Sequence, residues 1–154
     1  MTALEVAAEA YGRGDYARAI ENWEQAADGG DGEAEYQIGL MYANGTGVDQ
    51  DFQRAHDYFM TAAKKGHGEA EYSLGVIYSV GLGVERDAAE GAYWYTKAAD
   101  KGNPLAMCNL AGLYESGDGV TRDYLKAFGL FTMASVAVLP LILLVKVPKR
   151  TEED

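Results

Sequence analysis

Apolar residues recur along this chain at the spacing of one face of an α-helix. The first clear stripe has apolar side chains at i, i+4, i+7 and i+8, namely Ala34, Ile38, Met41 and Tyr42. Two glycines, Gly45 and Gly47, follow the stripe. Glycine tolerates the left-handed backbone conformation in which many helices end. The pattern therefore predicts a helix that starts near residue 34 and stops at the glycine pair.

The same pattern returns after 36 residues, and again after 36 more. Residues 34–48 are matched by residues 70–84 and 106–120, and each segment ends in Gly-x-Gly-Val. The residues that follow keep this register: Asp51, Asp87 and Asp123; Phe59, Tyr95 and Phe131; Ala62, Ala98 and Ala134. A first unit, over about residues 3–33, lacks five loop residues. Four stacked units can bury a continuous core between neighbours.

Each unit is also predicted to contain a second helix. An aspartate stands at its start and can accept hydrogen bonds from the free N–H groups of the first turn. These aspartates are Asp15, Asp51, Asp87 and Asp123. A small residue lies beside the core stripe of the first helix in the later units, at Gly39, Gly75 and Ala111. We expect these small residues to let the neighbouring helix approach closely.

These residues resemble the Sel1-like repeat family, which is related to the tetratricopeptide repeat. Its pattern is Ala-x-x-x-Leu-Gly-x-x-Tyr-x-x-Gly-x-Gly-Val, then Asp, Ala, an aromatic residue and Ala-Ala before Gly, and the second and third units match it nearly throughout. The resemblance implies an all-α, right-handed α-solenoid of helix-turn-helix repeats at about 3–33, 34–69, 70–105 and 106–135. It also implies a protein–protein interaction scaffold or adaptor, without identifying the partner.

A second stripe on the first helices is the candidate binding surface. Its residues are spaced i, i+4 and i+8 in each unit: Tyr36, Leu40 and Asn44; Tyr72, Val76 and Val80; Cys108, Gly112 and Ser116. In tetratricopeptide-like repeats these positions line the concave groove. The resemblance therefore implies a groove of tyrosine and small aliphatic side chains that binds a peptide or protein. The alternative is that these residues only pack between adjacent helices.

The remaining composition argues against other functions. The net charge of -11 opposes binding to nucleic-acid phosphates. The Gly-x-Gly loops lack the lysine of phosphate-binding loops. His56 and His67 stand alone and are interpreted as surface residues, and the single Cys108 is interpreted as a packed or groove-facing thiol. We therefore predict no enzyme, no metal and no cofactor.

One enzymatic alternative comes from the family resemblance. Some Sel1-like proteins are linked to cell-wall or β-lactam binding, which would suggest a hydrolase. Those proteins carry a pair of cysteines in each repeat. This chain has one cysteine in total, which weakens the transfer.

The repeat pattern fails after Ser135, so we predict a solenoid over residues 1–135 and a separate tail over residues 136–154. The tail has ten apolar residues interrupted by Pro140, too few to cross a bilayer. We favour a cap that folds over the last repeat. The alternatives are self-association through residues 136–147, which would make the chain a structural subunit, and membrane contact aided by Lys146, Lys149 and Arg150.

The N-terminus gives a weak indication of compartment. It has no basic region followed by an apolar one, so no signal peptide is visible and the cytoplasm is favoured. A chain that starts at a mature N-terminus would look the same, so a periplasmic or secreted location stays an alternative.

Overall fold

The computed structural model describes residues 1–143, and those residues form α-helices and loops without any strand. The helices alternate between first and second positions of the repeat units. They are α1 (Ala3–Gly12), α2 (Tyr16–Asp28), α3 (Gly32–Asn44), α4 (Phe52–Lys64), α5 (Gly68–Val80), α6 (Ala88–Asp100), α7 (Pro104–Ser116) and α8 (Tyr124–Leu143).

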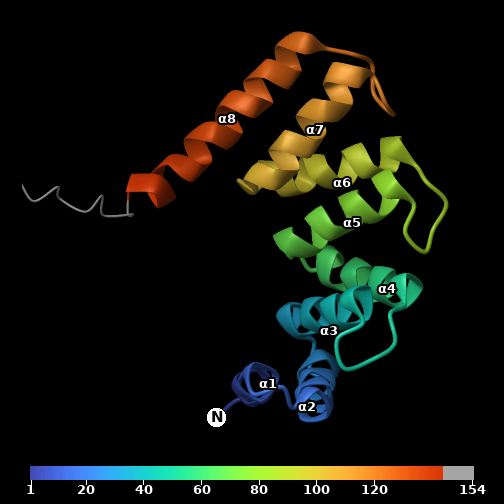
Figure 1. Cartoon of the computed structure of the whole chain (residues 1–154), viewed down its shortest axis with the longest axis vertical. Helices are drawn as coiled ribbons and strands as arrows, with labels where there is room; N and C mark the ends of the chain where they lie inside the picture. Colours follow the sequence, from blue (N-terminus) through green and yellow to red (C-terminus); the bar gives the residue numbers. More distant parts are fainter. Residues whose placement is uncertain (144–154) are drawn as a thin grey trace, which may run out of the picture.

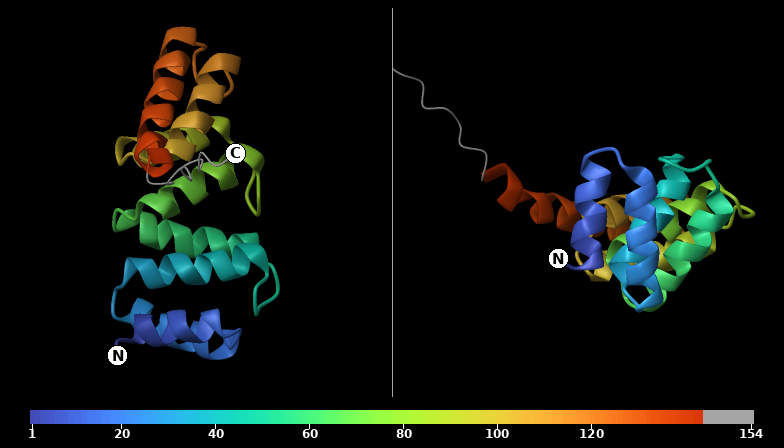
Figure 2. Two further views of the ribbon diagram at one scale, coloured as in Figure 1. Left: turned by 60° about the vertical axis from the view of Figure 1, so that its left-hand side comes forward. Right: turned by 90° about the horizontal axis from the view of Figure 1, so that it is seen from below.

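The helices stack as pairs along the longest axis of the molecule, from α1 and α2 at one end to α7 and α8 at the other (Figures 1 and 2). Each helix contacts the next one in the chain, and α5 also contacts α7. This arrangement confirms the all-α solenoid predicted from the repeats.

Capping residues define the helix ends as the sequence predicts. Asp87 Oδ1 accepts from the Glu90 N–H at 3.0 Å, and Asp123 Oδ1 accepts from the Lys126 N–H at 2.9 Å. At the other end of α5, Gly81 adopts a left-handed conformation with φ of +83°. A side chain with a Cβ rarely adopts this conformation, so the glycine fixes where the helix stops.

The small residues Gly39 on α3 and Gly75 on α5 each make room for a large aromatic residue on the second helix of the same unit. A Cβ added to Gly39 would lie 2.6 Å from the ring of Phe59, and one added to Gly75 would overlap the ring of Tyr95. Phe59 and Tyr95 are consequently only 2% and 3% exposed. The close approach predicted from these glycines is therefore present.

The second glycine of each Gly-x-Gly loop joins neighbouring units. A Cβ on Gly83 would lie 2.8 Å from Phe52, the first residue of the second helix in the preceding unit. Gly119 meets Ala88 in the same way one unit later. The loops therefore dock onto the start of the previous second helix, and this contact fixes the register between units.

The last helix is longer than the others. Helix α8 has 20 residues and continues without a break past Ser135, so residues 136–143 extend the second helix of the fourth unit. Figure 1 shows that its far end leads away from the stack. Residues 144–154, the rest of the expected cap, lie outside the described residues. The cap, and the division of the chain after residue 135, stay predictions.

Candidate partner-binding groove

A hollow of about 260 Å³ lies between α3 and α5. Leu40 forms part of one wall, Tyr72 and Val76 form part of the other, and Phe59 from α4 also lines it. The side chains that surround it are almost all apolar, so it can accept an apolar side chain from solvent.

A second hollow, of about 480 Å³, lies one unit further along, between α5 and α7. Tyr72, Val76 and Val80 line its α5 side, Cys108 lines its α7 side, and Tyr95 from α6 takes the place of Phe59. The two hollows are equivalent under the 36-residue repeat and share Tyr72 and Val76. We call this pair of hollows the groove.

The groove brings together five of the eight predicted site residues: Leu40, Tyr72, Val76, Val80 and Cys108. The other three do not line it. Tyr36 is half-buried against Phe59, with ring centroids 5.8 Å apart. Asn44 and Ser116 are exposed near the ends of α3 and α7.

Sequence reasoning missed the aromatic residues that the second helices contribute to the groove. The sequence identified Phe59 and Tyr95 as repeat-equivalent residues but assigned them no part in the groove. Asn109 was also missed; its Nδ2 donates to the Tyr95 hydroxyl at 3.3 Å. The signal that could have identified them is the glycine opposite each aromatic ring, because it lets the ring pack directly against the first helix that forms a wall of the hollow.

Next to the groove, His67 links the second and third units. Its Nδ1 accepts from the Ala70 N–H at 3.2 Å and thereby caps α5, while its Nε2 lies 2.8 Å from Oε2 of Glu33. Because Nδ1 accepts, the ring proton lies on Nε2 and is donated to Glu33. The ring also stacks on Tyr36, with centroids 4.6 Å apart.

Neither histidine is the surface residue that the sequence predicted. The side chains of His56 and His67 are 17% and 14% exposed, respectively. His56 Nε2 lies 2.9 Å from the hydroxyl of Tyr78 on the next first helix. Both rings are covered because they bridge neighbouring helices, a role that depends on tertiary packing.

Burial and hydrogen bonding around His67 shift two pKa values. Burial acts to raise the pKa of Glu33, but the hydrogen bonds from His67 and Gln37 outweigh it, so the pKa of Glu33 lies below its usual range. Burial, aided by the nearby charges of Glu69 and Glu33, raises the pKa of Tyr36. The Tyr36 hydroxyl therefore remains protonated at neutral pH.

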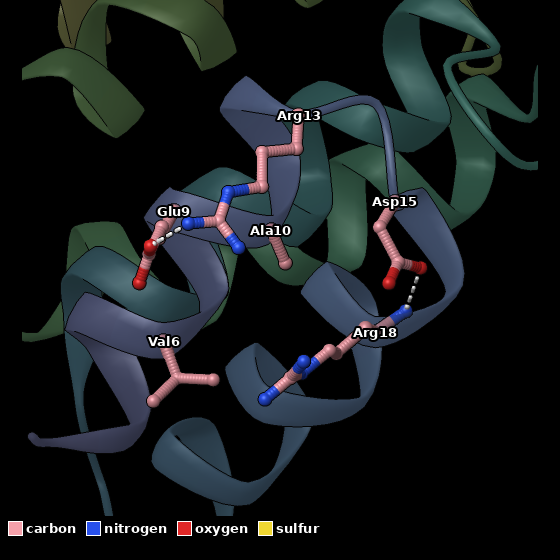
Figure 3. Close-up of a pocket in the computed structure, with 6 residues that line it drawn as sticks. All are labelled: Val6, Glu9, Ala10, Arg13, Asp15 and Arg18. Atoms are coloured by element: carbon pink, nitrogen blue, oxygen red, sulfur yellow. Dashed lines mark hydrogen bonds and ion pairs between the residues drawn. The ribbon is translucent and has the colours of Figure 1, made fainter.

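A smaller polar crevice, of about 70 Å³, lies at the junction of α1 and α2 (Figure 3). Arg13 is paired with Glu9, and the carboxylate of Asp15 accepts from the backbone N–H of Arg18 at 3.2 Å. Glu9 and Arg13 thus form an ion pair with each other, and Asp15 caps the start of α2. The crevice is therefore explained by how the two helices join.

The described residues contain no cluster of three or more His, Cys, Asp or Glu side chains that could hold a metal ion. Within the same part of the chain, no helix has both the length and the apolarity needed to span a membrane. The thiol of Cys108 is exposed in the groove, as one of its two sequence interpretations predicted.

Comparison with known proteins gives one family and several similar structures. The family model described as Sel1 repeat matches residues 4–31, 32–67, 68–103 and 104–135. No curated protein matches the chain. A protective antigen of uropathogenic Escherichia coli strains, which displays an SLR fold, is 35% identical with a TM-score of 0.75; the match covers 81% of this chain and 28% of the antigen.

Two further structures are similar. A Sel1 repeat protein from Oxalobacter formigenes is 25% identical with a TM-score of 0.83, over 87% of this chain and 55% of that protein. Cysteine rich protein B of Helicobacter pylori is 21% identical with a TM-score of 0.58, over 77% of this chain and 90% of that protein, and shows the fold alone. The chain thus spans about a quarter to just over half the length of the first two structures.

Proposed function

Because the chain belongs to the Sel1 repeat family, whose repeats generally form protein-interaction modules, we propose that it is a scaffold or adaptor that binds a peptide or protein segment in the groove. The observation that carries this proposal is the recurrence of the same apolar hollow in two successive units. A single hollow can arise from imperfect packing. Two hollows related by the repeat form a continuous strip along the first helices.

The chemistry of the groove indicates what kind of segment it would bind. The half-buried Tyr72 offers an aromatic ring, which gives large contact area at a small cost in side-chain entropy, and the buried Tyr95 lies beneath it. Val76 and Leu40 add aliphatic surface. Such a surface favours a ligand with apolar side chains that enter both hollows. The net charge of -11 favours a ligand that is not acidic.

Val80 is the best residue at which to test the groove. Its side chain is 59% exposed and lines the second hollow, so its substitution should not disturb the core. Tyr36 and Tyr72 are less suitable, because each packs against an aromatic residue of a second helix with ring centroids 5.8 to 5.9 Å apart. Truncating either tyrosine would confuse lost binding with lost stability.

The experiment selects peptides from a random displayed library against the whole chain and measures the affinity of the best ones by titration calorimetry. We expect Val80→Glu to weaken binding at least about tenfold, because a charge would enter an apolar contact. Tyr93→Glu is the matched control: Tyr93 is 51% exposed on α6 and lines neither hollow. Peptides that bind wild type and Val80→Glu equally well would rule out the groove.

A further inference from the structure

Helix α8 carries an exposed apolar stripe that the groove does not use. Its positions are spaced by four, three, four and three residues, which keeps them on one helix face: Tyr124, Phe128, Phe131, Ser135 and Val138. The aromatic members are 62%, 73% and 39% exposed in that order. We call this set the α8 stripe.

The α8 stripe corresponds to the surface that joins repeat units elsewhere in the solenoid. Phe131 is the equivalent of Phe59 and Tyr95, but it is 39% exposed where they are 2% and 3% exposed. Besides the glycine of their own unit, those two rings have a further first helix beside them. Asn109 of α7 donates to the Tyr95 hydroxyl, and Phe59 lines the hollow between α3 and α5.

Two other stripe positions show the same difference. Phe52 is covered by the loop glycine Gly83 of the next unit, whereas its equivalent, Tyr124, is 62% exposed. His56 contacts Tyr78 of the next unit, whereas its equivalent, Phe128, is 73% exposed. Among the described residues, α8 therefore presents an inter-unit interface without its cover, and this interface is more apolar than the one on α4.

We propose that the α8 stripe pairs antiparallel with the α8 stripe of a second copy of this chain, about a two-fold axis near Phe131. In this arrangement Phe128 meets the small Ser135 of the other copy, and Tyr124 meets Val138. Phe131 then meets its own copy at the axis, and on either side of it a larger side chain faces a smaller one. A two-fold axis requires only that the surface be complementary to itself.

Charge determines which part of the chain a second copy could contact. Residues 1–123 contain 21 Asp and Glu against nine Lys and Arg, so the bodies of two solenoids repel each other. Between Tyr124 and Leu143 the charged residue is Lys126, which lies on the α8 helix outside the stripe. Contact through α8 therefore joins the two copies at their least charged part. Helix α1 of a second copy would be a poorer binding surface for the α8 stripe, because Glu5 and Glu9 lie exposed on α1.

The size of the stripe indicates a reversible dimer. With about 200 Å² for an aromatic side chain, the exposed fractions of Tyr124, Phe128 and Phe131 give about 350 Å² per chain. Specific interfaces commonly bury about 800 Å² per partner. Flanking residues such as Leu125 and Val136, 86% and 58% exposed, add to this area. The contact starts at Tyr124, earlier in the chain than the self-association predicted for residues 136–147.

Sedimentation of the whole chain over a concentration series tests the proposal. We expect wild type to change from monomer to dimer as its concentration rises, and Phe128→Glu to remain a monomer. Val80→Glu, which places the same charge at a 59% exposed apolar residue of the groove, should dimerise like wild type. Phe128→Glu should in turn keep its peptide affinity, so failure of the groove and failure of the dimer are distinguishable. A wild type that is monomeric at every concentration, as expected if the stripe serves a different protein, would overturn the proposal.

Disulfide formation tests the antiparallel register. In a Cys108→Ser background, Phe128→Cys and Ser135→Cys chains mixed under mild oxidation should form a disulfide between them. Each variant alone should form much less, because cysteine would then face serine or phenylalanine. Equal cross-linking in the mixture and in the separate variants would contradict the proposed register.

Discussion

The ion pair between Glu71 and Lys101 provides a test of how charge is accommodated inside the solenoid. The Glu71 side chain is 1% exposed, and its Oε1 lies 2.5 Å from Nζ of Lys101. Nζ also donates to the carbonyl oxygen of Gly66 at 2.8 Å. Among residues 1–143, nothing forms a hydrogen bond with Oε2 of Glu71. Lys101 is therefore the main compensation for a carboxylate that folding removes from water.

Replacing Lys101 with alanine should destabilise the fold by about 3 kcal/mol. Removing one partner of a buried pair commonly costs about 3–5 kcal/mol, since the other charge is left uncompensated. Lys101 is 42% exposed, so solvent screening places the expected cost at the low end of that range. For a chain of this size, about 3 kcal/mol corresponds to a fall of roughly 6–12 °C in Tm.

The fourth repeat supplies the matched compensating change. The residues equivalent to Glu71 and Lys101 are Met107 and Ala137, so that unit dispenses with the ion pair, and Met107 is 4% exposed. Glu71→Met with Lys101→Ala copies this apolar arrangement into the third unit. We expect the double variant to lie within about 1 kcal/mol of wild type, because replacing a buried pair with apolar residues is often neutral.

Denaturant unfolding followed by helical circular dichroism measures all four members of this cycle. The expected order of stability places Lys101→Ala well below the other three, with Glu71→Met alone close to wild type because Lys101 can still reach water. If the double variant is as unstable as Lys101→Ala, the loss comes from the packing of the lysine stem and the reasoning fails. The slope of unfolding against denaturant should be equal in all four, which checks that the whole solenoid unfolds together.

Two further substitutions test the packing and the electrostatics near the groove. Gly75→Ala should destabilise by about 1–3 kcal/mol because its Cβ would overlap the ring of Tyr95. A Cβ on Gly112 would meet no described residue within 4 Å outside its own helix, so Gly112→Ala should be neutral or stabilise by up to about 1 kcal/mol. Thermal unfolding measures both. His67→Asn keeps a helix cap but removes the donor to Glu33, so the pKa of Glu33 should rise, as NMR titration would detect. In wild type, the lowered pKa of Glu33 stabilises the folded state at pH values above the ordinary pKa of 4.5. This stabilisation is lost as the pH falls through the pKa of the folded state, and His67→Asn should make the dependence of stability on pH flatter.

Local features of the fold could be predicted from the sequence because each has a local physical cause. An aspartate that accepts from the first turn places a helix start, as at Asp87, and a left-handed glycine places an end, as at Gly81. The 36-residue repeat adds a non-local constraint, because equivalent residues must occupy equivalent places. Together they gave the all-α stack without any information on contacts.

The groove was predicted less completely because a surface is built by more than one element. The i, i+4, i+8 rule selects Val76 and Val80, and both residues line the second hollow. It could not include Phe59 or Tyr95, which come from second helices. It also could not foresee that Tyr36 stacks on His67, since that contact joins a helix to a loop 31 residues away.

The fourth unit differs from the others in a way that connects the two proposed surfaces. At the groove positions it has small residues, with Cys108 in place of Tyr72 and Gly112 in place of Val76. The large side chains of the groove therefore come from the second and third units. On α8 the fourth unit instead carries Phe128, where α6 has Ala92. Compared with the third unit, the fourth unit therefore has fewer aromatic residues at the groove and more in the α8 stripe. If both grooves stay open in a dimer formed there, a partner with two binding segments is held more tightly than by one copy, because its second contact becomes intramolecular.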